Sequence, residues 1–85
     1  MPRYVVERTF VDGLHLEAED CLEIVDWNAD EGVTWLQSYV RDDGRKTFCV
    51  VDAPSPEAIR KTAVRNGLPV DSITQVRVLD PYFHT

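Results

Sequence analysis

Two runs of β-favouring residues, joined by a short turn, lie in the middle of the chain between residues 33 and 51. Val, Tyr, Trp and Phe are frequent in both runs, as is typical of strands. The turn is Asp42-Asp43-Gly44, and its glycine favours a three-residue hairpin loop because glycine readily adopts a positive φ. The pattern therefore predicts a β-hairpin in which Arg41 lies opposite Arg45.

This predicted register assigns the side chains of the hairpin to two faces, because cross-strand partners point to the same side of a sheet. The further pairs that it implies are Tyr39 with Thr47, Gln37 with Cys49, and Trp35 with Val51. The other face carries a mostly aliphatic set, Leu36, Ser38, Val40, Phe48 and Val50. We expect the aliphatic face to be core and the mixed face to be where a site lies.

The chain before the hairpin predicts one strand and one helix. Alternation over residues 3–10 predicts a strand, which a turn at Asp12-Gly13 ends. From residue 16 to residue 31 the apolar spacing becomes helical. The predicted inner stripe of this helix is Ala18, Cys21, Leu22, Val25 and Ala29, widened on one side by Ile24 and Trp27.

The chain after the hairpin predicts a second helix and a last strand. Ser55 followed by Pro56 is a typical helix start, because serine caps the first turn and proline needs no amide donor there. We expect this helix to end near Asn66, before Gly67. Its predicted inner stripe is Ile59, Thr62, Ala63 and Asn66. Residues 73–79 alternate as a strand.

The order β-α-β-β-α-β within a single domain of residues 1–85 predicts an α+β, ferredoxin-like fold. In this fold two helices cover one face of an antiparallel sheet and leave the other face open. The expected open face carries Trp35, Gln37, Tyr39, Cys49 and Val51, with Val5 and Glu7 from the first strand. Because apolar and aromatic surface of that kind is rarely left bare, we expect a homodimer through the open face.

The amino-acid composition disfavours nucleic acids and membranes as binding partners. The net charge of −6 disfavours binding to nucleic acids, whose phosphates attract basic proteins. The chain has no apolar run of membrane-spanning length and no signal-peptide pattern, so we expect a cytoplasmic protein without membrane contact. Two cysteines without CxxC spacing are expected to be reduced thiols.

Five segments follow one another along nearly the whole chain: ERTF, GLH, DEGVTWLQSYV, KTFCVVDAPSPEAIR and RNGLPVDSITQVRVLDPYF. This series resembles the small nickel-binding proteins of actinobacteria, a family otherwise described as a domain of unknown function. The resemblance implies a ferredoxin-like fold, a homodimer and a bound nickel ion, with other divalent transition metals as alternatives. Gln37 stands where some members carry His, so the resemblance supplies no complete ligand set.

Five residues are the candidate metal ligands: His15, Glu7, Cys49, Asp12 and His84. Imidazole suits nickel, copper and zinc, and His15 lies in the connection after the first strand. Glu7 is costly to bury unless it pairs with a metal or with a cation such as Arg77. Cys49 is either a small buried hydrophobe or a thiolate ligand.

Catalysis has little support, because the chain lacks a nucleophile-base-acid set, a glycine-rich phosphate loop and paired ligand spacing. An enzyme is therefore not favoured. The leading hypothesis is a homodimeric nickel-binding protein that acts in sequestration, delivery or sensing. The alternative is a dimeric domain that binds or converts a small organic molecule in an inter-sheet pocket. The residues that would wall this pocket are Glu7, Trp35, Gln37 and Tyr39. Trp35, Gln37 and Tyr39 could instead only form the dimer interface.

Overall fold

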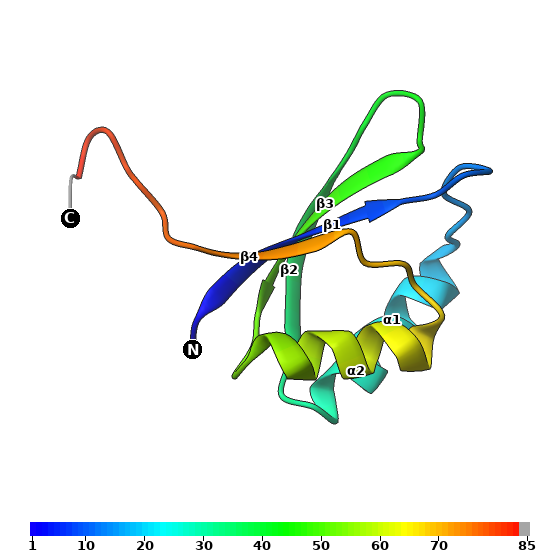
Figure 1. The fold of residues 1–85 in the computed structure, drawn as a ribbon, viewed down its shortest axis with the longest axis horizontal. Coiled ribbons are helices and arrows are strands. Elements are labelled where there is room, and N and C mark those ends of the chain that lie inside the picture. Colours follow the sequence, from blue (N-terminus) through cyan, green and yellow to red (C-terminus); the bar gives the residue numbers. More distant parts are fainter. Residues whose placement is uncertain (84–85) are drawn as a thin grey trace.

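The computed structural model of the chain describes residues 1–83 and contains four strands and two helices. Their bounds are β1 Arg3–Thr9, α1 Ala18–Ala29, β2 Thr34–Val40, β3 Lys46–Asp52, α2 Pro56–Asn66 and β4 Ser72–Val76. The strands form one antiparallel sheet in the order β2-β3-β1-β4, and both helices lie on the same side of it (Figure 1). The predicted α+β architecture with ferredoxin-like element order is confirmed.

Helix α2 forms as predicted. The Ser55 side chain accepts a hydrogen bond of 3.3 Å from the Ala58 N–H, and Pro56 occupies the first helical position. Gly67 ends the helix in the left-handed conformation, with φ of +68°, which costs glycine little. Ile59 and the small residues on the same side are buried against the sheet. Most of the core contributed by helices therefore comes from α2.

Helix α1 turns only part of its predicted inner stripe towards the rest of the protein. Its inner side carries Asn28, which is buried, and the half-buried Cys21, Ile24 and Trp27. Leu22 and Val25 are 68% and 44% exposed, so their assignment to the inner stripe was wrong. Apolar residues occur on two neighbouring sides of this helix, so either side could turn inward. The hydrogen bond of 3.3 Å from Asn66 Nδ2 to Asn28 Oδ1 links α1 to α2 and favours the side that carries Asn28.

The hairpin loop between β2 and β3 is one residue longer than predicted. The Arg41 N–H donates to the Lys46 carbonyl over 2.8 Å, so Arg41 does not lie opposite Arg45. The register is thereby shifted by one: the pairs are Val40 with Thr47, Tyr39 with Phe48, Ser38 with Cys49 and Gln37 with Val50. A bulge between Trp35 and Gln37 absorbs the shift, and Trp35 lies opposite Val51 as predicted.

The two faces of β3 are the reverse of the prediction. Cys49 and Val51 belong to the buried cluster that includes Val6 and Ile59, so they face the helices. Phe48 and Val50 pair with Glu7 and Val5 of β1 on the opposite face. Because both faces of β3 are apolar, alternation along the strand does not tell which one the helices cover.

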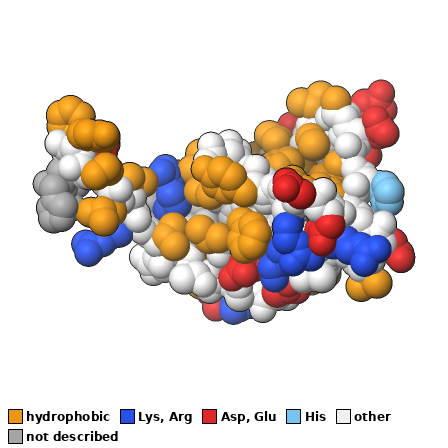
Figure 2. Space-filling model, turned by 90° about the horizontal axis from the view of Figure 1, so that it is seen from above, with side chains coloured by type: hydrophobic (Ala, Val, Ile, Leu, Met, Phe, Trp, Pro, Cys, Tyr) orange, Lys and Arg blue, Asp and Glu red, His pale blue; other side chains and the backbone are white. Residues whose placement is uncertain are grey.

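The open face of the sheet has an apolar centre, and hydrophobic side chains are seen along it in Figure 2. The strand registers place Val5, Glu7, Phe48, Val50, Tyr39 and Gln37 on this face. The expected positions of Val5, Glu7, Gln37 and Tyr39 are therefore confirmed. Trp35 instead packs against the buried cluster on the helix side.

Charged side chains at one end of the open face are paired within the chain. Lys46 Nζ lies 2.8 Å from Asp71 Oδ2 and 3.7 Å from Glu7 Oε1, and the Ser72 hydroxyl donates to Glu7 over 2.8 Å. The suggested pairing of Glu7 with Arg77 was wrong, because Glu7 lies opposite Ser72 in the antiparallel register of β1 with β4. Arg77 follows Val76, which pairs with Arg3 at the other end of β1. Hydrogen bonds from Lys46 and then Thr9 hold the pKa of Asp71 below its ordinary value.

We predict that Ile59→Ala lowers the free energy of unfolding by about 2–4 kcal/mol, because it removes a fully buried side chain and leaves a cavity. Val64→Ala on the same helix is the matched control. Val64 is 82% exposed, and its replacement should change the free energy by less than about 0.5 kcal/mol. Urea denaturation followed by circular dichroism measures both, and equal losses in the two variants would contradict the assigned core.

We predict that Asp71→Asn weakens the dependence of stability on acid pH. The lowered pKa means that the ionised carboxylate stabilises the folded state above the ordinary value of 3.8, and that this contribution disappears as pH falls through the lower folded value. The variant should be less stable than the wild type at neutral pH and should lose less stability on acidification. Asp26→Asn, an exposed site on α1, should keep the wild-type curve. Parallel curves for Asp71→Asn and the wild type would refute the pairing.

Candidate functional site

The predicted metal ligands do not come together in the described part of the chain. Glu7 lies on the open face of the sheet, whereas Cys49 is buried on the helix side. The sheet itself separates these two side chains, so they cannot bind one ion within a single chain. His84 lies outside the described residues.

His15 lies in the connection between β1 and α1, and its side chain is exposed. The ring Nε2 is 3.2 Å from the carbonyl oxygen of Asp12, which keeps the imidazole close to that turn. A shallow hollow of about 350 Å³ lies beside it, with Asp20 and Glu23 from α1 among its lining residues. Their spacing of three places both carboxylates on one side of a helix. In the sequence they belong to an acid-rich run over residues 17–30, which is most simply a solvated helix face and indicates no specific site.

This arrangement falls short of a closed metal site. Asp20 accepts a hydrogen bond of 3.0 Å from the Glu17 N–H, so its carboxylate is already engaged in capping α1. Within residues 1–83, no three His, Cys, Asp or Glu side chains converge on a point where they could hold an ion. A complete nickel site therefore does not fit inside the described part of one chain.

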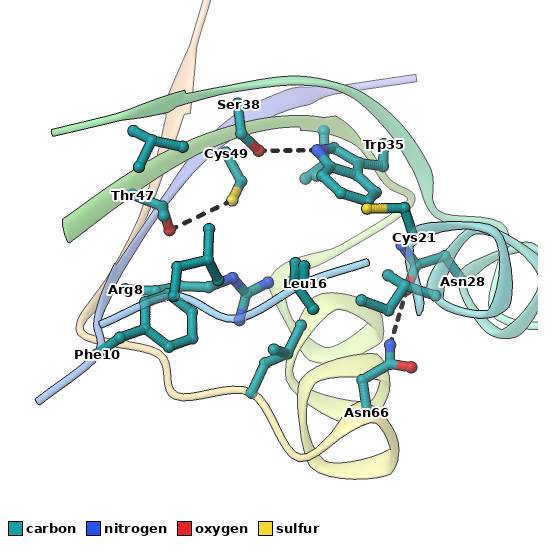
Figure 3. A pocket seen from close by; sticks show the side chains of 15 residues that line it. Arg8, Phe10, Leu16, Cys21, Asn28, Trp35, Ser38, Thr47, Cys49 and Asn66 are labelled. Atoms are coloured by element: carbon teal, nitrogen blue, oxygen red, sulfur yellow. Dashed lines mark hydrogen bonds between the residues drawn. The ribbon is translucent and has the colours of Figure 1, made fainter. Parts of the chain in front are cut away.

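A cavity of about 290 Å³ lies between the helix side of the sheet and helix α1. Its wall is mostly apolar, with side chains from strands, from both helices and from two loops (Figure 3). The lining residues are Arg8, Phe10, Leu14, Leu16, Cys21, Ile24, Asn28, Trp35, Ser38, Val40, Thr47, Cys49, Val51, Asn66 and Leu68. Apolar walls with few polar groups are typical of binding pockets for small molecules.

Most polar groups of the cavity wall are paired with one another. Trp35 Nε1 donates to Ser38 Oγ over 2.8 Å, and the Thr47 hydroxyl lies 3.7 Å from the Cys49 sulfur. Arg8 Nη1 donates to the carbonyl oxygen of Pro69 over 2.8 Å. Sequence reasoning missed this cavity. The alternation of β1 could have indicated it, because it puts the charged Arg8 on the same face as the buried Tyr4 and Val6.

The pocket expected from the sequence is divided between the two sides of the sheet. Trp35 lines the cavity, whereas Gln37 and Tyr39 lie on the open face, where Gln37 Nε2 donates to the Tyr39 hydroxyl over 2.8 Å. Glu7 is on that open face too. The bulge between Trp35 and Gln37 causes this separation, because an extra residue reverses the alternation of β2.

Neither helix of the described chain has the length and apolar character needed to cross a membrane. Comparison with curated proteins gave no match. The crystal structure of SCO4226 from Streptomyces coelicolor A3(2) is similar to this chain, with a TM-score of 0.68 and 19% identity over 92% of this chain and 99% of that one. At this identity the likeness concerns the fold alone.

The model of a family described as "Nickel responsive protein SCO4226-like" matches residues 4–76. This match runs from β1 to the end of β4 and so includes all six elements of the fold. It agrees with the resemblance noted in the five sequence segments. The chain therefore belongs to the SCO4226-like family of nickel-responsive proteins.

Proposed function

We propose that this chain binds nickel and serves in the sequestration, delivery or sensing of that ion in the cytoplasm. The observation that supports the proposal most is membership of a family described as nickel-responsive. The exposed imidazole of His15 is the residue of the described chain best suited to anchor such an ion, because imidazole is a good ligand for nickel. Other divalent transition metals would compete for the same nitrogen.

The proposed ion is held at the surface, at the rim of the fold near His15. Asp20 and Glu23 line the neighbouring hollow, and Asp12 lies three residues before His15 in the same connection. Water, these carboxylates, His84 or donors from a second copy would complete the coordination. Glu7 and Cys49 are left out of this arrangement because they lie on the two sides of the sheet.

We further propose that the protein is a homodimer formed through its open sheet face. The apolar centre of this face includes Val5, Phe48, Val50 and Tyr39, and the charges beside it already have partners within the chain. Such a face can be covered without leaving unpaired charges behind. The segment after β4 also leaves the body of the domain (Figure 1) and exposes apolar side chains, among them Leu79, Tyr82 and Phe83. These side chains are available to a second copy.

We predict that His15→Ala weakens nickel binding at least about tenfold, since it removes the proposed nitrogen ligand, and tenfold corresponds to about 1.4 kcal/mol. Calorimetric titration of metal-depleted protein with nickel measures the affinity. The control Glu57→Gln, at an exposed position of α2, should bind like the wild type. His84→Ala tests the remaining imidazole. Unchanged affinity in His15→Ala would rule out the proposed anchor.

We predict that the wild type has about twice the 9.7 kDa mass of one chain at low-micromolar concentration, measured by light scattering. Tyr39→Lys should shift it towards monomer, because the change puts a charge into the proposed interface. Val64→Lys is the control, since Val64 is also exposed but lies on α2, on the other side of the sheet. A monomeric wild type, or equal shifts in both variants, would contradict the proposed interface.

A further inference from the structure

Arg8 is a buried cation without an acidic partner. Its side chain is on the helix side of β1, and the residue is only 7% exposed. One hydrogen bond is formed, from Nη1 to the Pro69 carbonyl oxygen. Within residues 1–83 the guanidinium forms no ion pair, whereas Arg3, Arg41, Arg60 and Arg65 each do. This buried arginine therefore lacks the carboxylate partner that the four more exposed arginines have.

An unpaired buried guanidinium is energetically costly. It carries a permanent charge and five N–H donors in one plane. Burial of most of the side chain limits the water that can bind these donors, and an anion that replaces this water forms stronger, charge-assisted hydrogen bonds. A single backbone carbonyl satisfies one donor. The other Arg8 nitrogens are not fully buried, and Arg8 lines the cavity, so these donors are open to a ligand there. The remaining donors favour an anion from outside the chain.

The surroundings of Arg8 provide space for such an anion. The guanidinium lies among the side chains that line the cavity, near Leu16 in Figure 3. At about 290 Å³ the cavity is larger than an engineered apolar cavity of about 150 Å³ that binds benzene. One ring with a short acidic side chain therefore fits its size. Ile24, Trp35 and Leu68 supply an apolar wall for the ring.

A second polar group in the wall also lacks a partner. Asn66 Oδ1 is buried and accepts no hydrogen bond, although Asn66 Nδ2 donates to Asn28. Asn66 and Arg8 come from different elements and lie on different sides of the cavity (Figure 3). This oxygen is closed to water-sized groups, so a ligand in the cavity meets Arg8 and not Asn66 Oδ1.

We propose that this cavity is a binding site for a small aromatic carboxylate. The carboxylate accepts hydrogen bonds from Arg8 in the two-point geometry that arginine favours. The ring packs on the apolar wall. This site lies on the helix side of the sheet and requires no metal. It is next to the hollow beside His15, and the two share the lining residues Leu16, Ile24, Asn66 and Leu68.

The test compares two probes of nearly equal shape, phenylacetate and its neutral amide, by calorimetry in metal-depleted buffer. We expect the acid to bind with a Kd below about 1 mM and the amide at least about tenfold more weakly. The indole N–H resonance of Trp35, a cavity residue, should shift with the acid in NMR spectra. Equal binding of acid and amide to the wild type, or no binding of the acid up to about 10 mM, would overturn the proposal.

Substitutions locate the effect on Arg8. Arg8→Gln should remove the preference for the acid over the amide, because the charge that distinguishes the two probes is gone. Arg45→Gln, at an exposed position of the hairpin loop, should retain the wild-type preference. An acid preference that persists in folded Arg8→Gln would overturn the assignment. If Arg8→Gln does not fold, the comparison of acid and amide on the wild type decides alone.

Discussion

The antiparallel pairing of β1 with β3 is the constraint on which the rest of the structure depends. Cys49 lies opposite Val6 and Val51 opposite Tyr4, and these pairs form the buried surface that α2 covers through Ile59. The same pairing puts Val5 opposite Val50 on the open face. A slip of one residue would exchange the two sets. Both proposed surfaces, the cavity under the helices and the face offered to a second copy, follow from this register.

Much of the fold is predictable from the sequence because several local signals agree. Ser55, Pro56 and Gly67 define the two ends of α2, and the small residues beside Ile59 define its buried side. The change from alternating to helical spacing after Gly13 separates β1 from α1. Once the element order is known, the short connections between elements allow few topologies, and the ferredoxin-like arrangement is one of them.

The prediction failed where either of two faces of a strand or helix could be buried with a similar gain in apolar contact. Phe48 and Val50 compete with Cys49 and Val51 for the core side of β3, and Leu22 and Val25 compete with Cys21 and Ile24 on α1. Partners distant in the sequence decide both cases, and alternation does not contain that information. The candidate site was harder still. The acidic neighbours of His15 and the cavity around Arg8 arise only when α1 and the loops pack against the sheet.

The central claim is that α2 covers the face of the sheet formed by Val6, Cys49 and Val51. Nuclear Overhauser contacts of the Ile59 methyl groups test this most directly, because such contacts require protons a few ångströms apart. The structure predicts that Ile59 methyl protons are close to those of Val6 and Val51, since all three belong to one buried cluster. Contacts of Ile59 with Val5 and Val50 instead would show that the faces are reversed, and would contradict both the cavity and the open face described above.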